Sequence, residues 1–145
     1  MTFIRPQRLI CPSPPGSLLK RSETAPVARK APNSDQDAGY LALVQCCPCL
    51  RCGMEPTEAA HVRYASAAFG KSSGMQKKPP DRFAVPLCAD CHRLARDAQH
   101  RQNERAFWEA IDINPLIVAT NLYAKRGDLI AMRAVCFVAI AERIR

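Results

Sequence analysis

The sequence lacks both an export signal and any apolar run that could cross a bilayer. Its longest uninterrupted apolar stretch runs from Ala134 to Ala141, far short of the roughly 20 residues that a membrane-spanning helix needs. The first residues, MTFIRPQRLICPSPPG, carry prolines where a signal peptide has its apolar segment. We therefore predict a cytoplasmic protein that has no membrane partner.

Without export the chain stays in a reducing compartment, where clustered cysteines bind metal more often than they form disulfides. Four of the eight cysteines form two Cys-x-x-Cys pairs, Cys49 with Cys52 and Cys88 with Cys91. Each such turn directs two thiolates at one ion, and two turns complete a tetrahedral zinc site. The pattern predicts structural Zn²⁺, with iron as the alternative ion for four cysteines. The neighbouring Cys46 and Cys47 are less regularly spaced and are left out of the predicted site.

The charge is strongly unbalanced. The chain has 21 Lys and Arg against 13 Asp and Glu, a formal net charge of +8, which suits a polyanionic partner such as nucleic acid. Residues 1–39 also contain 6 of the 12 prolines, so we predict a disordered, basic N-terminal tail there. Residues 40–145 are predicted to form the folded domain.

The patterns in the folded part indicate an α+β protein. Residues 61–66 and 82–87 are predicted to form a β-hairpin around a basic loop. Helices are expected at 89–98, from Asn103, from Asn114 and over 129–143, because capping residues precede the last three. Apolar residues nearly encircle the last helix, which must pack into the core or against a partner chain. The sequence leaves the oligomeric state open.

All three histidines, His61, His92 and His100, lie within or just beyond the segment that the two cysteine pairs frame. His92 follows Cys91 directly, so a zinc-bound turn would fix the position of its imidazole. A neutral imidazole can take a proton from water, and a second one can hold a divalent ion beside a phosphate.

The runs CLRCG, EAAHVRY, GMQKKPPDRFAVPLCADCHR and DAQHRQNERAFW together resemble the HNH (ββα-metal) nucleases. They are most similar to the phage and prophage branch related to the RecA-dependent recombination-enhancement nucleases. The resemblance covers about residues 47–124. It implies a small zinc-stapled, treble-clef-like ββα-metal core with additional C-terminal helices, cleavage of DNA, a phage-encoded bacterial protein, and a recombinase filament as a further partner.

The resemblance also implies a role for individual residues. His61 matches the general base, the four paired cysteines match the zinc ligands, and His92 and His100 match ligands of a catalytic Mg²⁺ or another divalent cation. Arg63, on the predicted strand face of His61, is expected to hold the scissile phosphate. Contacts to the DNA backbone are expected from the basic residues of the hairpin loop and its end, namely Lys71, Lys77, Lys78 and Arg82.

Three positions depart from the family pattern. Ala60 stands where many members have an Asp or His ligand, and Phe83 lies near the position of the family's middle Asn. His92 and His100 are eight residues apart, which on a straight helix means about 12 Å of rise and about 80° of rotation. Either the helix breaks near 97–99 or His100 is not a ligand. The alternative function is a non-catalytic treble-clef zinc module that binds nucleic acid.

Overall fold

The computed structural model describes residues 35–72 and 78–143, which form a small α+β fold with a two-stranded sheet. The predicted tail, apart from its last residues, and Lys77 lie outside the described residues. Along the chain come the following elements: α1 (Ala38–Val44), β1 (Glu58–His61), η1 (Ala67–Phe69), η2 (Asp81–Phe83), β2 (Ala84–Leu87), η3 (Asp90–Leu94), η4 (Gln99–Arg101), α2 (Glu104–Ala110), α3 (Pro115–Ala124) and α4 (Leu129–Glu142).

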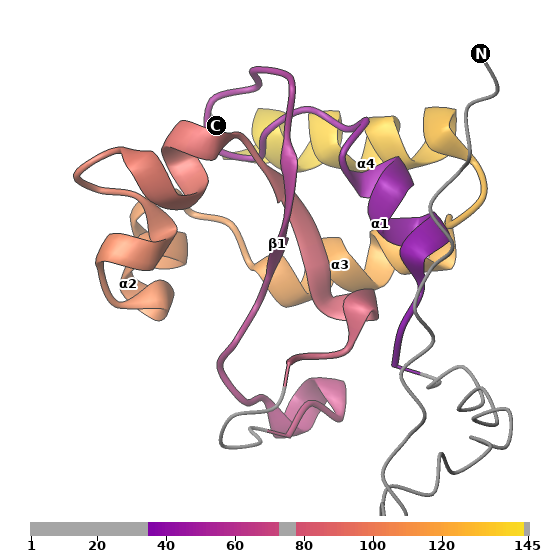
Figure 1. The fold of residues 1–145 in the computed structure, drawn as a ribbon, viewed down its shortest axis with the longest axis horizontal. Coiled ribbons are helices and arrows are strands. Elements are labelled where there is room, and N and C mark those ends of the chain that lie inside the picture. The colour runs from indigo at the N-terminus through magenta and orange to yellow at the C-terminus, as the bar shows by residue number, and fades with distance from the viewer. Residues whose placement is uncertain (1–34, 73–77, 144–145) are drawn as a thin grey trace, which may run out of the picture. The chain divides into compact units, whose positions relative to one another are not determined.

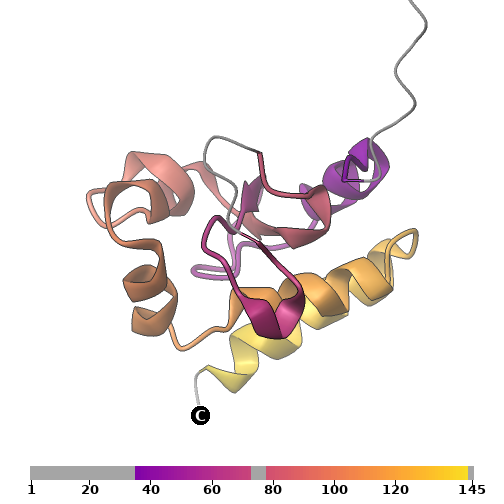
Figure 2. The same cartoon turned by 90° about the horizontal axis from the view of Figure 1, so that it is seen from below.

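The hairpin lies at the centre of the fold, with α3 and α4 side by side on one side of it (Figures 1 and 2). β1 and β2 pair antiparallel, with Glu58 opposite Leu87 and His61 opposite Ala84. The Val62 amide donates to the Phe83 carbonyl oxygen at 3.0 Å and extends the pairing by one residue. Every residue of β2 is buried, and the helices pack against this strand.

The first strand lies earlier in the chain than the sequence predicted. The predicted strand 61–66 shares only His61 with β1. After Val62 the chain leaves the sheet, because the Arg63 amide donates to the Glu104 carboxylate at 2.9 Å instead of to β2. The turn η2 ends the ladder from the other side. His61 and Arg63 therefore do not share a strand face as predicted.

The capping residues predicted from the sequence begin the C-terminal helices. The Asn103 side chain accepts hydrogen bonds from the amides of the first turn of α2, and Asn114 does so for α3. Asp128 accepts from the Ala131 amide at the start of α4. Gly127, with φ +95°, turns the chain between α3 and α4, a conformation that favours glycine.

The predicted helix 89–98 is broken, which is one of the two alternatives that the spacing of His92 and His100 left open. The single wide turn η3 ends at Leu94, and Ala95 is extended, with ψ 157°. Ala98 is extended as well, and η4 then forms a separate turn that contains His100. The break starts slightly earlier than expected, at Ala95.

The folded domain begins slightly before residue 40, where the sequence predicted its boundary. Tyr40 is buried, and its hydroxyl donates to the Ala84 carbonyl oxygen at 3.0 Å. The predicted domain boundary at residue 40 falls inside α1, and the Asp35 carbonyl oxygen already accepts from the Asp81 amide at 2.8 Å. The folded domain thus includes Asp35. None of the helices in the described part of the chain has the length and apolarity that a membrane span would need.

Candidate metal centre and active site

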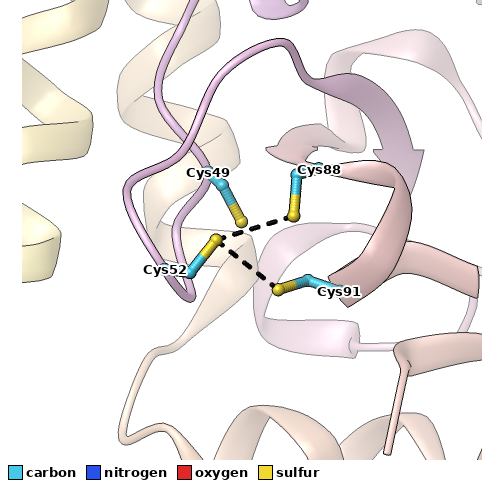
Figure 3. A group of neighbouring side chains, drawn as sticks. All are labelled: Cys49, Cys52, Cys88 and Cys91. Atoms are coloured by element: carbon cyan, nitrogen blue, oxygen red, sulfur yellow. Dashed lines mark hydrogen bonds between the residues drawn. The ribbon is translucent and has the colours of Figure 1, made fainter. Parts of the chain in front are cut away.

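The four cysteines of the two Cys-x-x-Cys pairs converge. Their sulfur atoms all lie within 4.8 Å of one another, and no other group of three or more potential ligands does so in the described residues. Figure 3 shows the four side chains pointing toward one another from two loops. The Cys52 sulfur lies 3.5 Å from that of Cys88 and 3.7 Å from that of Cys91. Sulfurs about 2.3 Å from a tetrahedral zinc are about 3.8 Å apart, so this cluster could hold such an ion.

Local hydrogen bonds shape the first cysteine loop. The Gly53 amide donates to the Cys49 carbonyl oxygen at 2.8 Å, and Gly53 has φ +74°, which glycine adopts without strain. The Leu50 amide donates to the Pro86 carbonyl oxygen at 3.1 Å, which ties this loop to β2. Because Cys88 directly follows β2, both cysteine pairs are anchored to the same strand.

The thiols of the cluster are electrostatically suited to a cation. Burial raises the pKa of Cys52 and Cys91, and neighbouring sulfurs raise it further, because adjacent thiolates would repel one another. Burial by itself would raise the pKa of Cys49 as well. Backbone amides near the cysteines donate to its sulfur, however, and the net effect is a lowered pKa. A bound divalent cation would remove the repulsion and stabilise four thiolates.

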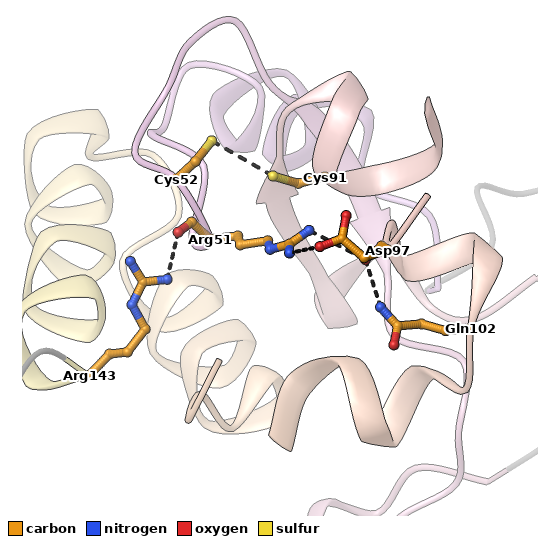
Figure 4. A network of polar contacts seen from close by, with 6 residues as sticks. All are labelled: Arg51, Cys52, Cys91, Asp97, Gln102 and Arg143. Carbon is orange, nitrogen blue, oxygen red and sulfur yellow. Dashed lines mark hydrogen bonds and ion pairs between the residues drawn. The ribbon is translucent and has the colours of Figure 1, made fainter. Parts of the chain in front are cut away.

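A polar network braces the first loop from two sides (Figure 4). The Arg51 guanidinium pairs with the Asp97 carboxylate, between η3 and η4. At the end of α4, Arg143 donates to the carbonyl oxygens of Leu50, at 3.1 Å, and Arg51, at 2.6 Å. The cysteine cluster is therefore coupled to the segment that carries His92 and His100 and to the last helix.

At the other end of β1, His61 is paired with a carboxylate. Its Nε2 lies 2.8 Å from Oδ1 of Asp81, which comes from η2 and is almost completely buried. The Asp37 amide donates to the other carboxylate oxygen at 3.0 Å, and the Lys78 ammonium lies 2.9 Å from Oδ1. Burial alone would raise the pKa of Asp81, but these hydrogen bonds outweigh it and hold the pKa below its ordinary value.

The ionised Asp81 determines which nitrogen of His61 is free. An ionised carboxylate only accepts hydrogen bonds, so Nε2 of His61 carries the proton and donates it. In a neutral imidazole the other nitrogen, Nδ1, then has the lone pair. The imidazole is only partly buried. The arrangement can hold His61 in one orientation with Nδ1 ready to accept a proton.

His92 has a carboxylate partner of its own. Its Nδ1 lies 2.7 Å from Oε2 of Glu58, at the start of β1, and Arg93 donates to Oε1 of Glu58 at 2.7 Å. The hydrogen bonds from Arg93 and His92 lower the pKa of Glu58. Glu58 is thus ionised and accepts from Nδ1, which leaves the lone pair of His92 on Nε2. A carboxylate that orients a histidine in this way is the usual partner of a metal-binding imidazole.

The break between η3 and η4 brings His100 next to His92. Their ring centroids are 4.4 Å apart, with the planes at 66°. Burial lowers the pKa of His100, and the charges of His92 and Arg63 lower it further, which keeps the imidazole neutral, as metal ligation requires. Two imidazoles are a donor set typical of transition-metal ions such as Ni²⁺ or Zn²⁺, more than of Mg²⁺.

The structure brings His92 and His100 together, but it pairs His61 with other residues. Glu58, the partner of His92, precedes His61 by three residues on β1, a rise of roughly 10 Å along an extended strand. Among the described residues the three histidines do not converge on one point. A substrate would have to extend between His61 and the His92–His100 pair for both to act on it.

Arg63 lies beside His100. These two residues line a small cavity of about 210 Å³ with Gln99, Gln102 and Glu104. The Glu104 carboxylate accepts from the Arg63 amide and, at 2.7 Å, from the Gln99 side chain. The family resemblance extends to Glu104, and its contacts give it a structural role, holding η4 against the end of the hairpin.

The predicted DNA-backbone contacts divide into two groups. Lys78 and Arg82 are exposed, and Arg82 lies over the Phe83 ring at 5.0 Å. Lys71 differs from the prediction because it is buried and donates to the carbonyl oxygens of Arg63 and Tyr64, at 3.2 and 2.7 Å. Its ammonium points into the protein and cannot reach a phosphate, so Lys71 is removed from the candidate DNA surface.

Sequence reasoning missed the two acidic partners. Glu58 and Asp81 meet histidines that are 34 and 20 residues away in the chain, and neither falls into a short motif. The signals were the glutamate that opens EAAH and the aspartate that follows Pro79 and Pro80. The spacing alone did not relate either residue to a particular histidine.

Comparison of the chain with known protein families, proteins and structures does not assign a family to it. No protein-family model, no curated protein and no solved structure matches the chain.

Proposed function

We propose that the protein is a metal-dependent endonuclease that hydrolyses DNA phosphodiester bonds. The observation that carries the proposal is the His61–Asp81 pair, a partly exposed imidazole held by a buried, ionised carboxylate with one ring nitrogen free. Such a pair is how proteins prepare a histidine to act as a general base. The net charge of +8 supports a nucleic-acid substrate.

In the proposed mechanism Nδ1 of His61 takes a proton from a water molecule, and the resulting hydroxide attacks the phosphorus. The P–O ester bond opposite the attacking oxygen breaks, and the leaving oxygen takes a proton from solvent. Asp81 holds the ring through Nε2 and stabilises the positive charge that the imidazole gains. Arg63, beside His100, donates hydrogen bonds to a phosphate oxygen. Lys78 and Arg82 contact neighbouring phosphates and position the DNA without reading its sequence.

His92 and His100 would hold the catalytic divalent cation, with Glu58 fixing the His92 ring. A bound cation supplies charge neutralisation at the phosphate and at the leaving oxygen. The four cysteines would hold a structural Zn²⁺ that keeps the hairpin and η3 in register. A recombinase filament remains a proposed partner, suggested by the family resemblance alone.

The test is cleavage of supercoiled plasmid and single-stranded DNA by the wild type and by His61→Ala, in Mg²⁺, Mn²⁺ and Ni²⁺. The two proteins are purified identically, and their folding and DNA affinity are compared. We expect metal-dependent cutting by the wild type, reduced in His61→Ala by about 10²- to 10⁴-fold, the usual contribution of a general base. Equal cutting by both proteins would remove His61 from the mechanism.

The second candidate is a non-catalytic zinc module that binds nucleic acid. It is favoured by one observation, that in the described residues no third ligand joins His92 and His100. DNA binding by both proteins, with no cutting in any of the three metals, would support this module. DNA affinity measured in the same preparations separates it from an inactive sample.

A further inference from the structure

An apolar groove lies between α3 and α4. It has a volume of about 380 Å³ and is lined along α4 by Ala131, Ala134, Val135, Val138, Ala139 and Glu142, and along α3 by Ile117, Val118, Asn121 and Lys125. Ile117 and Val138 remain 49% and 56% exposed. The fold thus leaves one long apolar face of its last two helices without a covering element in the described residues.

The two ends of this groove carry opposite charges. The short link 125–128 makes α3 and α4 antiparallel neighbours, so Lys125 lies at the end that contains Ala131, and Glu142 lies at the end that contains Ile117. Neither Lys125 nor Glu142 forms a salt bridge within residues 35–72 and 78–143. The nearby Arg126 and Arg143 are directed elsewhere, since they donate to backbone carbonyls of Tyr123 and of the cysteine loop.

We propose that this groove is the interface with a second copy of this chain, packed about a two-fold axis. A two-fold axis perpendicular to the groove turns its ends around, so Lys125 of each copy meets Glu142 of the other. Asn121, midway along the groove, then lies close to Asn121 of the second copy, and the two amides can bond reciprocally. An antiparallel second copy places a negative charge opposite Lys125 and a positive charge opposite Glu142. This complementarity is the reason for proposing a second copy of the chain as the partner in the groove.

The charge distribution allows two copies to approach on this side. Residues 107–145, which include α3 and α4, carry 5 basic and 4 acidic side chains, whereas residues 1–106 hold most of the net charge of +8. Packing through α3 and α4 therefore brings together parts of the two copies that carry little net charge. The small side chains of Ala131, Ala134 and Ala139 allow close contact between helices.

The first experiment measures the mass of the full-length protein by sedimentation velocity, from about 1 to about 200 µM. We expect a concentration-dependent monomer–dimer equilibrium. Val138→Asp places a charge in the apolar groove and should weaken dimerisation at least 100-fold. Because Val138 is more than half exposed, the monomer should keep its circular dichroism spectrum. A wild-type protein that stays monomeric over the whole range would overturn the proposal.

Charge exchange provides a test that does not depend on disturbing the apolar surface. Lys125→Glu alone and Glu142→Lys alone each place like charges opposite one another, and each should weaken dimerisation by on the order of tenfold. The double variant, and an equimolar mixture of the two single variants, should both recover dimers of wild-type affinity. A dimer that is indifferent to both single exchanges would place the interface elsewhere on the molecule.

Discussion

The cysteine cluster and the histidine–carboxylate pairs arrange their side chains in opposite ways. The four sulfurs converge on one point and leave no position open, as in structural zinc sites. Each of the histidines His61 and His92 is instead held by one carboxylate through one nitrogen and keeps the other nitrogen free. A closed cluster supports the fold, whereas an oriented, open imidazole can act on something from outside. We therefore propose a supporting role for the cysteine cluster and a chemical role for the two oriented histidines.

The largest effect is expected when one of the four clustered cysteines is replaced. Cys91→Ser should abolish zinc binding and leave the core unfolded or strongly destabilised, because binding free energy at a structural zinc site is folding free energy. The measurement is zinc content by elemental analysis together with thermal melting. Cys46→Ser, an exposed cysteine outside the cluster, is the matched control and should change neither. A fully folded, zinc-loaded Cys91→Ser protein would disprove the closed site.

The next largest effect is expected at Asp81. Asp81→Asn replaces an acceptor-only group by one that can donate to Nε2, which allows the wrong tautomer of His61. We expect DNA cleavage to fall by on the order of 10²- to 10⁴-fold, with zinc content unchanged. A cleavage rate equal to that of the wild type would show that the carboxylate does not orient the base.

A substitution at Glu58 tests the second oriented imidazole, that of His92. Glu58→Gln removes the negative charge that orients His92, and loss of such a partner typically costs about 10- to 100-fold in metal affinity. The concentration of Mn²⁺ or Ni²⁺ that gives half-maximal cleavage should rise by that factor. Structural zinc should remain at wild-type content. A rise in zinc loss instead would make Glu58 a residue of the closed cluster.

Asp81 also makes stability depend on pH. Its pKa is lower in the folded protein than in the unfolded chain, so its contribution is fully present above the unfolded value of about 3.9 and is lost as the pH falls through the folded value. At pH 7 Asp81→Asn should reduce the free energy of unfolding by about 1–3 kcal/mol. Denaturant titrations should show this difference shrinking below about pH 4. If the difference in the free energy of unfolding between the wild type and Asp81→Asn did not change with pH, its cause would be packing and not the charge of Asp81.

The smallest effects should separate buried from exposed basic residues. Arg82 is exposed, and Arg82→Ala should lower the slope of DNA affinity against salt by about one, as for a single phosphate contact. Lys71→Ala should leave that slope unchanged and destabilise the fold, because its ammonium bonds two carbonyl oxygens. Salt-dependent binding titrations and thermal melts of both variants measure the contrast.

The sequence predicted the features that depend on short spacings. The caps Asn103, Asn114 and Asp128 and the convergence of the paired cysteines follow from local chemistry, and the structure confirms them. The spacing of His92 and His100 left two alternatives, a helix break near 97–99 or a His100 that is not a ligand, and the structure has the break, starting at Ala95. Each of these depends on residues at most a few turns apart or on a pattern that repeats.

The features that depend on distant contacts were missed. β1 ends at His61, instead of starting there, because Glu104, more than 40 residues further on, takes the Arg63 amide out of the ladder. The carboxylates of Glu58 and Asp81 find their histidines only after the hairpin has formed. Lys71 was placed on the surface because a lysine in a Gly-rich, Ser-rich loop usually is exposed, and nothing nearby in the sequence indicates that its chain turns inward.

The hydrogen bonds from Arg143 to the Leu50 and Arg51 carbonyls make the far end of α4 part of the metal centre. Shortening the chain just before Arg143, or fusing a tag there, acts on the loop that presents Cys49 and Cys52. Such a change would show up as faster exchange of the bound ion with a chelator before it showed up as lost helix. In engineered variants, changes at the end of the last helix would therefore alter how long a metal ion stays bound to the cysteines. Fusions are better placed at the N-terminus.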